Sequence, residues 1–193
     1  MTIKKAFRIG LTVILGLALI QAYDGEPLLF FNYFTNTGNV IIFVLMLGIL
    51  FEYIPEKHII LGVMIGLVIN IVYVNLLIDD YAIISDIVDS EWQWGVLHYL
   101  VPYVLLIDFI WGVQEAMPKV RTLIIYLVIP VTYLIYAFIY GTLTGTYAYF
   151  FLDIPTTGIT GVMAYVIGIF TFYLVLGSTL LYFKTKAEKK RLH

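Results

Sequence analysis

Six long runs of apolar residues constrain this chain more than any other feature of its sequence. A helix needs roughly 20 mainly apolar residues to cross the hydrocarbon core of a bilayer. We expect membrane spans at about residues 6–23, 32–54, 59–78, 95–113, 122–141 and 158–183. Because these spans fill most of the 193 residues, we expect a single six-helix domain, 1–193, that ends in a basic tail at 184–193.

The composition agrees with lipid as the solvent of this chain. Hydrophobic residues make up 62% and charged residues 12%, whereas soluble domains are about 45–50% apolar and about 25% charged. A transmembrane β-barrel would alternate polar and apolar residues along each strand, but runs such as VIIFVLMLGIL at 40–50 are continuous. The sequence therefore predicts an all-α integral membrane protein, a bundle of six transmembrane helices. The chain has no cysteine, which excludes disulfides and thiolate metal sites.

The distribution of basic residues predicts the orientation of this bundle, because Lys and Arg favour cytoplasmic loops. With a cytoplasmic N-terminus, all eleven fall on the cytoplasmic side: Lys4, Lys5, Arg8, Lys57, Lys119, Arg121, Lys184, Lys186, Lys189, Lys190 and Arg191. We therefore expect both termini to be cytoplasmic. A signal peptide cleaved near Ala22 would leave five spans instead, but the charge pattern already works with the first segment retained.

Other local signals concern packing. Gly62 and Gly66 form a small-xxx-small pair, which is typical of close helix contacts in lipid. Pro102 and Pro130 each remove a helix hydrogen bond and predict kinks in the fourth and fifth spans. The loop at about 79–95 contains apolar residues and two tryptophans, so we expect a short helix there that lies at the membrane interface.

Polar side chains inside a span are costly in lipid and usually face the interior of the bundle. The second span opens with FFNYFTNTGN, in which four polar residues follow i, i+3, i+4, i+7 spacing: Asn32, Thr35, Asn36 and Asn39. On one helix these four share a face, whereas Thr37 lies off it. We therefore predict a polar stripe that looks inward from the outer part of this span.

The fourth span contains two further polar residues. His98 is about one turn in from its outer end, at the expected depth of Thr35, and Asn75 in the third span should lie at that level as well. Asp108 is ten residues further along, or about 15 Å deeper at helical rise. An unpaired carboxylate is expensive there, so we expect it to be protonated or hydrogen-bonded to a partner such as a tyrosine, in a structural role.

A hydroxyl and an imidazole form the minimum nucleophile–base pair, so Thr35 and His98 are the candidate catalytic residues. A structural alternative stays open, because such groups often form interhelical hydrogen bonds worth about 0.6–2 kcal/mol. One buried histidine without other clustered ligands makes a poor metal site, and we expect neither a metal nor another cofactor. We expect no nucleic-acid partner, and the sequence leaves the oligomeric state open.

Three segments taken together resemble the androgen-induced-protein and androgen-dependent-regulator family of multi-spanning membrane proteins, which has bacterial relatives. They are FFNYFTNTGN, VLHYLVPYVLLIDFIWG and GTLTGTYAYFFLDIP, and their order and spacing agree over nearly the whole chain. The third segment departs from the family pattern, because Ala148 and Phe150 replace prolines.

The resemblance implies a threonine hydrolase that cleaves fatty acid esters of hydroxy fatty acids, with a membrane lipid ester as substrate. Carried over by motif, Thr35 is the nucleophile and His98 its partner, and Thr37 is the alternative nucleophile. The candidate oxyanion or pocket residues are Asn32, Asn36, Asn39 and Asn75.

An alternative function uses the same polar residues without chemistry. A small multi-pass transporter or lipid-binding membrane protein would use them as a cavity, with Asp108 as a proton or cation site. The short form of the chain resembles the bacterial relatives and implies a bacterial cell membrane. A eukaryotic chain would lie in the endoplasmic or plasma membrane.

Overall fold

The computed structural model describes residues 2–77 and 92–191, and this part of the chain is helical with no strand. Four of its helical runs are long and apolar enough to cross a membrane: Glu56–Leu77, Trp92–Gly112, Arg121–Thr144 and Ile154–Ala187. The prediction of an all-helical fold is confirmed for the described residues, and these four runs agree with a membrane protein. The first two expected spans correspond to α1 (Ile3–Ala22) and to the shorter apolar helix α3 (Phe34–Leu50).

The chain divides into two compact units, and each is described by itself. The first unit comprises Met1–Gly25 and Thr35–Met117, and the second comprises Glu26–Phe34 and Pro118–His193. The first contains α1, α3, a 3-10 turn η1 (Glu56–His58), α4 (Ile59–Val72), η2 (Tyr73–Leu77), α6 (Trp92–Gly95), η3 (Val96–Leu100), α7 (Val101–Ile107) and η4 (Asp108–Gly112). The second contains α2 (Pro27–Asn32), α8 (Arg121–Tyr126), α9 (Val128–Thr144), η5 (Phe150–Leu152) and α10 (Ile154–Arg191).

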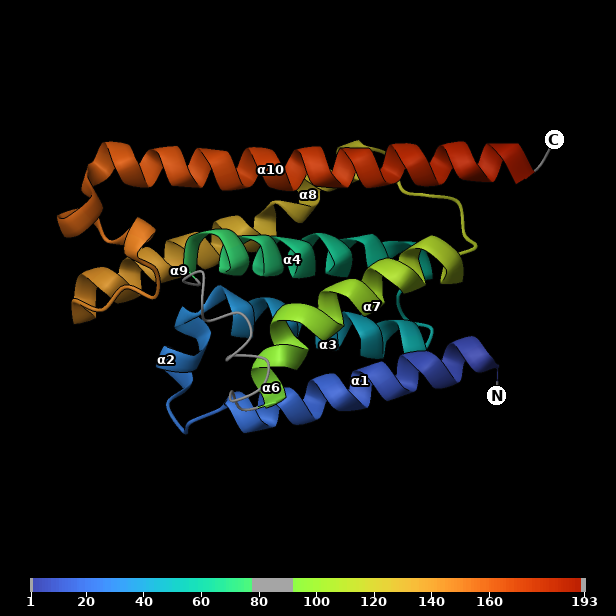
Figure 1. Cartoon of the computed structure of the whole chain (residues 1–193), viewed down its shortest axis with the longest axis horizontal. Helices are drawn as coiled ribbons and strands as arrows, with labels where there is room; N and C mark the ends of the chain where they lie inside the picture. Colours follow the sequence, from blue (N-terminus) through green and yellow to red (C-terminus); the bar gives the residue numbers. More distant parts are fainter. Residues whose placement is uncertain (1, 78–91, 192–193) are drawn as a thin grey trace. The chain divides into compact units, whose positions relative to one another are not determined.

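The first unit is built around close contact between α4 and α7, which lie side by side (Figure 1). A Cβ atom added at Gly66 would lie 3.1 Å from the Cα atom of Pro102, and one at Gly62 would lie 3.3 Å from a methyl group of Leu105. Both distances are tighter than most Cβ contacts, so the absence of a side chain at these positions lets the two helices pack closely. The packing face expected from the Gly62–Gly66 spacing is therefore confirmed.

The helical run from Trp92 to Gly112 is interrupted by two π-turns, η3 and η4, on either side of α7. In these turns the amide of Val101 donates to the carbonyl of Val96, five residues back, and Val113 donates likewise to Asp108. Pro102 has no amide hydrogen for the carbonyl of His98, and that carbonyl instead accepts from the side chain of Asn70 at 2.9 Å. The irregularity expected at Pro102 thus takes the form of widened turns.

The second expected span, 32–54, differs from the structure at both ends. Tyr33 is extended between α2 and α3, and the carbonyl of Asn32 at the end of α2 accepts from the hydroxyl of Tyr133 at 2.6 Å. At the other end, Glu52 adopts φ 63°, and the amides of Glu52 and Tyr53 donate to Ile49 and Gly48. This left-handed cap ends α3 at Leu50.

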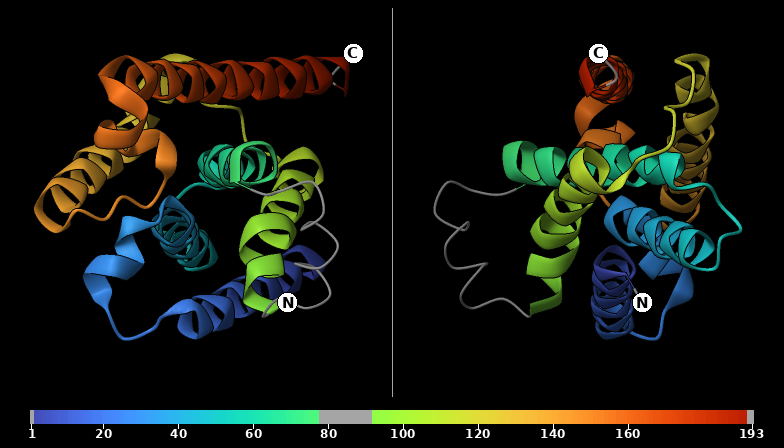
Figure 2. Two further views of the ribbon diagram at one scale, coloured as in Figure 1. Left: turned by 60° about the vertical axis from the view of Figure 1, so that its left-hand side comes forward. Right: turned by 90° about the vertical axis from the view of Figure 1, so that its right-hand side faces the viewer.

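The second unit also departs from uniform spans. The break at Leu127 between α8 and α9 comes one turn before Pro130, where a kink is expected. Gly158 has φ 72° and bends the start of α10, as Figure 2 shows. Beyond this bend, α10 continues to Arg191, so the basic tail begins as part of the helix rather than as a separate segment.

The expected interfacial helix at about 79–95 lies mostly outside the described residues, since 78–91 are not among them. Its two tryptophans, Trp92 and Trp94, belong to α6 at the start of the fourth expected span.

Candidate active site in the first unit

Thr35 and His98 come together in the first unit. The Oγ1 atom of Thr35, in the first turn of α3, lies 3.2 Å from Nε2 of His98 in the π-turn η3. Thr35 is 8% exposed and His98 is 2% exposed, so this contact is shielded. The predicted convergence of hydroxyl and imidazole is thus observed, while their catalytic roles remain a prediction.

The contact of the second ring nitrogen of His98, Nδ1, shows which side chain donates the hydrogen bond between Thr35 and His98. Nδ1 of His98 lies 3.1 Å from the backbone carbonyl oxygen of Trp94, which only accepts hydrogen bonds. In the neutral ring, Nδ1 therefore holds the proton and donates it to Trp94, which leaves the lone pair of Nε2 facing Thr35. The hydroxyl of Thr35 then donates to Nε2, as a nucleophile does to its general base.

Two aromatic rings fix the plane of this imidazole. The indole of Trp94 stacks on it at a centroid distance of 5.1 Å and an angle of 11°. The phenol of Tyr73 lies at 4.0 Å, tilted by 31°. Both rings present their π faces to the histidine ring, and such a face attracts a positive charge. They would therefore stabilise an imidazolium formed during proton transfer.

Two asparagines complete what we call the neutral cluster, which comprises Thr35, Asn39, Asn70, His98 and Tyr103. Asn39 is one turn after Thr35, and its Nδ2 donates to the carbonyls of Thr35 at 2.8 Å and Leu97 at 3.3 Å. Asn70 donates to the carbonyl of His98 and accepts from the hydroxyl of Tyr103 at 3.0 Å. The backbones on either side of the Thr35–His98 contact are therefore held by side-chain amides.

The expected polar stripe is only partly assembled. Asn36 and Thr37 are both half-buried at the start of α3. Asn75 is exposed and donates to the carbonyl of Ile71 in its own helix at 2.8 Å, so it is not part of the buried cluster, contrary to expectation. Asn75 lies within the π-turn η2, which begins at Tyr73.

Asn32 belongs to the second unit, because the extended Tyr33 ends α2 before α3 begins. The i, i+3 relation to Thr35 assumed one continuous helix and does not hold. The side chain of Asn32 is fully buried, and neither its Nδ2 nor its Oδ1 has a hydrogen-bond partner within the described part of the chain.

Asp108 pairs with an arginine, not with a tyrosine. Its two oxygens accept from Nε of Arg8 at 2.7 Å and from Nη2 at 3.1 Å, a two-point contact buried between α1 and η4. Arg8 also donates through Nη1 to Glu56 at 2.9 Å. The expected structural role of Asp108 agrees with this pairing, and the partner is corrected.

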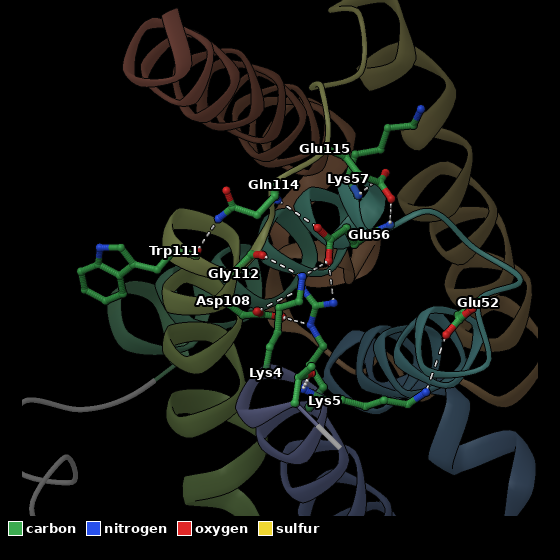
Figure 3. Close-up of polar contacts among 12 residues, drawn as sticks. Lys4, Lys5, Glu52, Glu56, Lys57, Asp108, Trp111, Gly112, Gln114 and Glu115 are labelled. Carbon is green, nitrogen blue, oxygen red and sulfur yellow. Dashed lines mark hydrogen bonds and ion pairs between the residues drawn. The ribbon is translucent and has the colours of Figure 1, made fainter. Parts of the chain in front are cut away.

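Further contacts extend this ion pair into what we call the charged cluster: Lys4, Arg8, Glu56, Asp108 and Glu115. Lys4 donates to Glu56 at 2.7 Å and to the carbonyl of Gly112 at 3.2 Å. The carboxylate of Glu115 accepts from the amides of Glu56 and Lys57, both at 3.3 Å. Figure 3 shows Lys4, Asp108 and Glu115 gathered around Glu56. The cluster ties together α1, the turn η1 that precedes α4, and the end of the 92–112 run.

Neither cluster groups its side chains as a metal site does. Among residues 2–77 and 92–191, no three His, Asp or Glu side chains are grouped so that they could hold a metal ion. The reactive groups of the neutral cluster are a hydroxyl, an imidazole and amides, which suit acyl transfer by a nucleophile and a base.

Several of these residues were not predicted, although the sequence contains features that point to their roles. Arg8 was assigned to a cytoplasmic flank, but a cation inside an apolar run is the natural partner for an acid in another span. Asn70 is polar within the third span, and Pro102 leaves the carbonyl of His98 in need of a donor. Trp94 precedes His98 by four residues, a spacing that places both on one face of a helix, whereas no comparable signal relates Tyr73 to His98.

Comparisons with family models, with curated proteins and with solved structures find no match to this chain. The geometry of the neutral cluster is therefore the main support for a function.

Proposed function

We propose that this protein is an intramembrane hydrolase of lipid esters, with Thr35 as nucleophile and His98 as general base. The observation that carries the proposal is the 3.2 Å contact between Thr35 Oγ1 and His98 Nε2, combined with the carbonyl of Trp94 at Nδ1. This pairing directs the basic nitrogen at the hydroxyl and needs no change of tautomer before reaction.

The proposed reaction has two steps. His98 Nε2 accepts the proton of Thr35 while Oγ1 attacks the ester carbonyl, and the alcohol then leaves with that proton. The resulting acyl-threonine is hydrolysed by water in the second step. Nδ1 stays protonated throughout, held by the carbonyl of Trp94, and the rings of Trp94 and Tyr73 stabilise the transient imidazolium.

An ester of long acyl chains is the substrate class that fits a buried pair in a membrane protein. Such esters partition into lipid, and fatty acid esters of hydroxy fatty acids are the substrates implied by the family that the chain resembles. The proposal includes six spans, both termini in the cytoplasm and a bacterial cell membrane. These three parts of the proposal are supported by the distribution of charged residues and by the family resemblance.

The rival transporter hypothesis used Asp108 as a proton or cation site. Both oxygens of Asp108 accept from Arg8, so a cation would have to displace a guanidinium held by two hydrogen bonds. This pairing favours the hydrolase.

Turnover of a long-chain ester by the purified protein tests the proposal. Thr35→Ala should abolish fatty acid release, and His98→Ala should lower it by about 10²–10⁴-fold. Thr37→Ala is the matched control, one hydroxyl removed two residues away, and should retain turnover. Full activity in Thr35→Ala would leave the pair as an interhelical hydrogen bond and reject the proposal.

A further inference from the structure

Asn39 contains a buried hydrogen-bond acceptor that the neutral cluster does not use. Its Oδ1 has no partner among the described residues, although the side chain is fully buried. We propose that Asn39 Oδ1 binds the water molecule that hydrolyses the acyl-threonine on Thr35. This inference rests on the proposed function and assigns a site for its second reactant.

The orientation of the Asn39 amide follows from its surroundings. Nδ2 faces the carbonyl oxygens of Thr35 and Leu97. Turning the amide over would place its oxygen against two other acceptors and lose both hydrogen bonds. The oxygen is therefore fixed on the opposite side of the amide, where it needs a donor.

A buried acceptor without a donor is destabilising, and proteins usually satisfy such a group with an ordered water molecule. Asn70 shows the alternative arrangement within the same cluster. Its Nδ2 also donates to a backbone carbonyl, that of His98, but its Oδ1 is already occupied by the hydroxyl of Tyr103. Of these two amides, Asn39 alone has an oxygen available for a donor from outside the cluster.

The position of Asn39 suits the second step of the reaction. It follows Thr35 by one helical turn, and it is hydrogen-bonded to Leu97, the residue directly before His98. Water that donates one proton to Asn39 Oδ1 has its second proton available for His98 Nε2. The water oxygen then bonds to the acyl carbon, and the bond from that carbon to Thr35 Oγ1 breaks. The proton on His98 returns to Oγ1, which releases a fatty acid and restores the free threonine.

The test separates the two steps with a p-nitrophenyl ester of a long-chain fatty acid. A burst of p-nitrophenol reports formation of the acyl-threonine, and the following steady rate reports its hydrolysis. Asn39→Leu should keep a burst of about one equivalent, at a rate within about threefold of wild type, while the steady rate falls by about tenfold or more. Intact-protein mass spectrometry should then show the acyl adduct accumulating.

Asn70→Leu is the matched control, because it removes an equivalent amide-to-carbonyl bond without removing an open acceptor. Its burst and steady rates should change by the same factor, with no accumulated adduct. An unchanged steady rate in Asn39→Leu, or equal losses in both phases, would overturn the assignment of the water site.

If Asn39→Leu yields no burst at all, Asn39→Ala is measured in the same way. Loss of the burst in both variants would show that Asn39 has a structural role in helix packing, and it would overturn the proposal. A burst with slow hydrolysis in Asn39→Ala supports it. A wild-type protein that shows neither burst nor turnover would instead reject the proposed function, so the two failures are distinguishable.

Discussion

The charged cluster and the neutral cluster lie in the same unit, and they differ in how completely their acceptors are used. In the charged cluster, each oxygen of Asp108, Glu56 and Glu115 accepts a hydrogen bond from another part of the unit. In the neutral cluster, Asn39 Oδ1 has no partner among the described residues, and the proton of Thr35 faces an imidazole that can take it.

This difference separates a structural role from a reactive one. Buried charges are tolerated when every oxygen is satisfied, and their removal exposes the remaining partner to a low dielectric. Neutral groups can be left partly unsatisfied at smaller cost, and an unused acceptor can then bind water or substrate. We therefore interpret the charged cluster as a clamp on three helix ends and the neutral cluster as the reaction site.

The largest effect is expected from breaking the clamp at its centre. Arg8→Leu leaves the carboxylate of Asp108 buried without its cation and should lower the free energy of unfolding by about 3–5 kcal/mol. Denaturant unfolding in detergent measures this loss. Arg8→Leu combined with Asp108→Leu should restore most of it, because no charge is then stranded. A loss under about 1 kcal/mol in the single variant would contradict the clamp.

A smaller loss is expected where Gly112 makes room for Asp108. A Cβ atom at this position would overlap Oδ1 of Asp108, so Gly112→Ala should lower the free energy of unfolding by about 1–3 kcal/mol. Gly10→Ala in α1 is the control, because a Cβ there meets nothing within 4 Å. That variant should be neutral or stabilising by up to about 1 kcal/mol. Equal results for the two would show that Asp108 is not held over Gly112.

The neutral cluster should respond more in rate than in stability. Trp94→Leu removes the ring stacked on His98, an interaction worth about 0.5–1.5 kcal/mol, or up to about tenfold in ester turnover. Trp111→Leu is the control, since that indole is 65% exposed and should leave turnover unchanged. If both variants lose turnover equally, the stack on His98 has no specific effect.

The smallest effect is expected at the edge of the charged cluster. The side chain of Lys4 is 40% exposed, so Lys4→Met should change the free energy of unfolding by only about 0–1 kcal/mol. Glu56 keeps its hydrogen bonds from Arg8 and Gln114 in this variant. A loss as large as that of Arg8→Leu would mean that the clamp is centred on Glu56 instead of Asp108.

The sequence predicts the features that depend on local pattern. The length and apolarity of the runs predict helices that could cross a membrane, and the glycine pair predicts which face of α4 packs closely on a neighbour. Similar depth in neighbouring spans, together with the family resemblance, places Thr35 near His98, and the 3.2 Å contact agrees with it.

What the sequence did not predict depends on partners far along the chain. The helix ends at Asn32 because its carbonyl accepts from Tyr133, which is 101 residues away, and periodicity contains no information about such a bond. Arg8 and Asp108 are separated by 100 residues, and the local sequence around each shows only a charged side chain that would be unfavourable in lipid without a partner. Depth alone suggested a pocket role for Asn75, but its side chain is exposed in the π-turn η2 and bonds to the carbonyl of Ile71 in its own helix.

The central claim is that His98 activates the hydroxyl of Thr35, and the most direct measurement is to locate a covalent adduct. Purified protein is treated with a fluorophosphonate probe, and the labelled peptide is identified by mass spectrometry. We predict a single adduct on Thr35 that is lost in His98→Ala and retained in Thr37→Ala. An adduct on Thr37, or equal labelling of Thr35 in His98→Ala, would contradict the account.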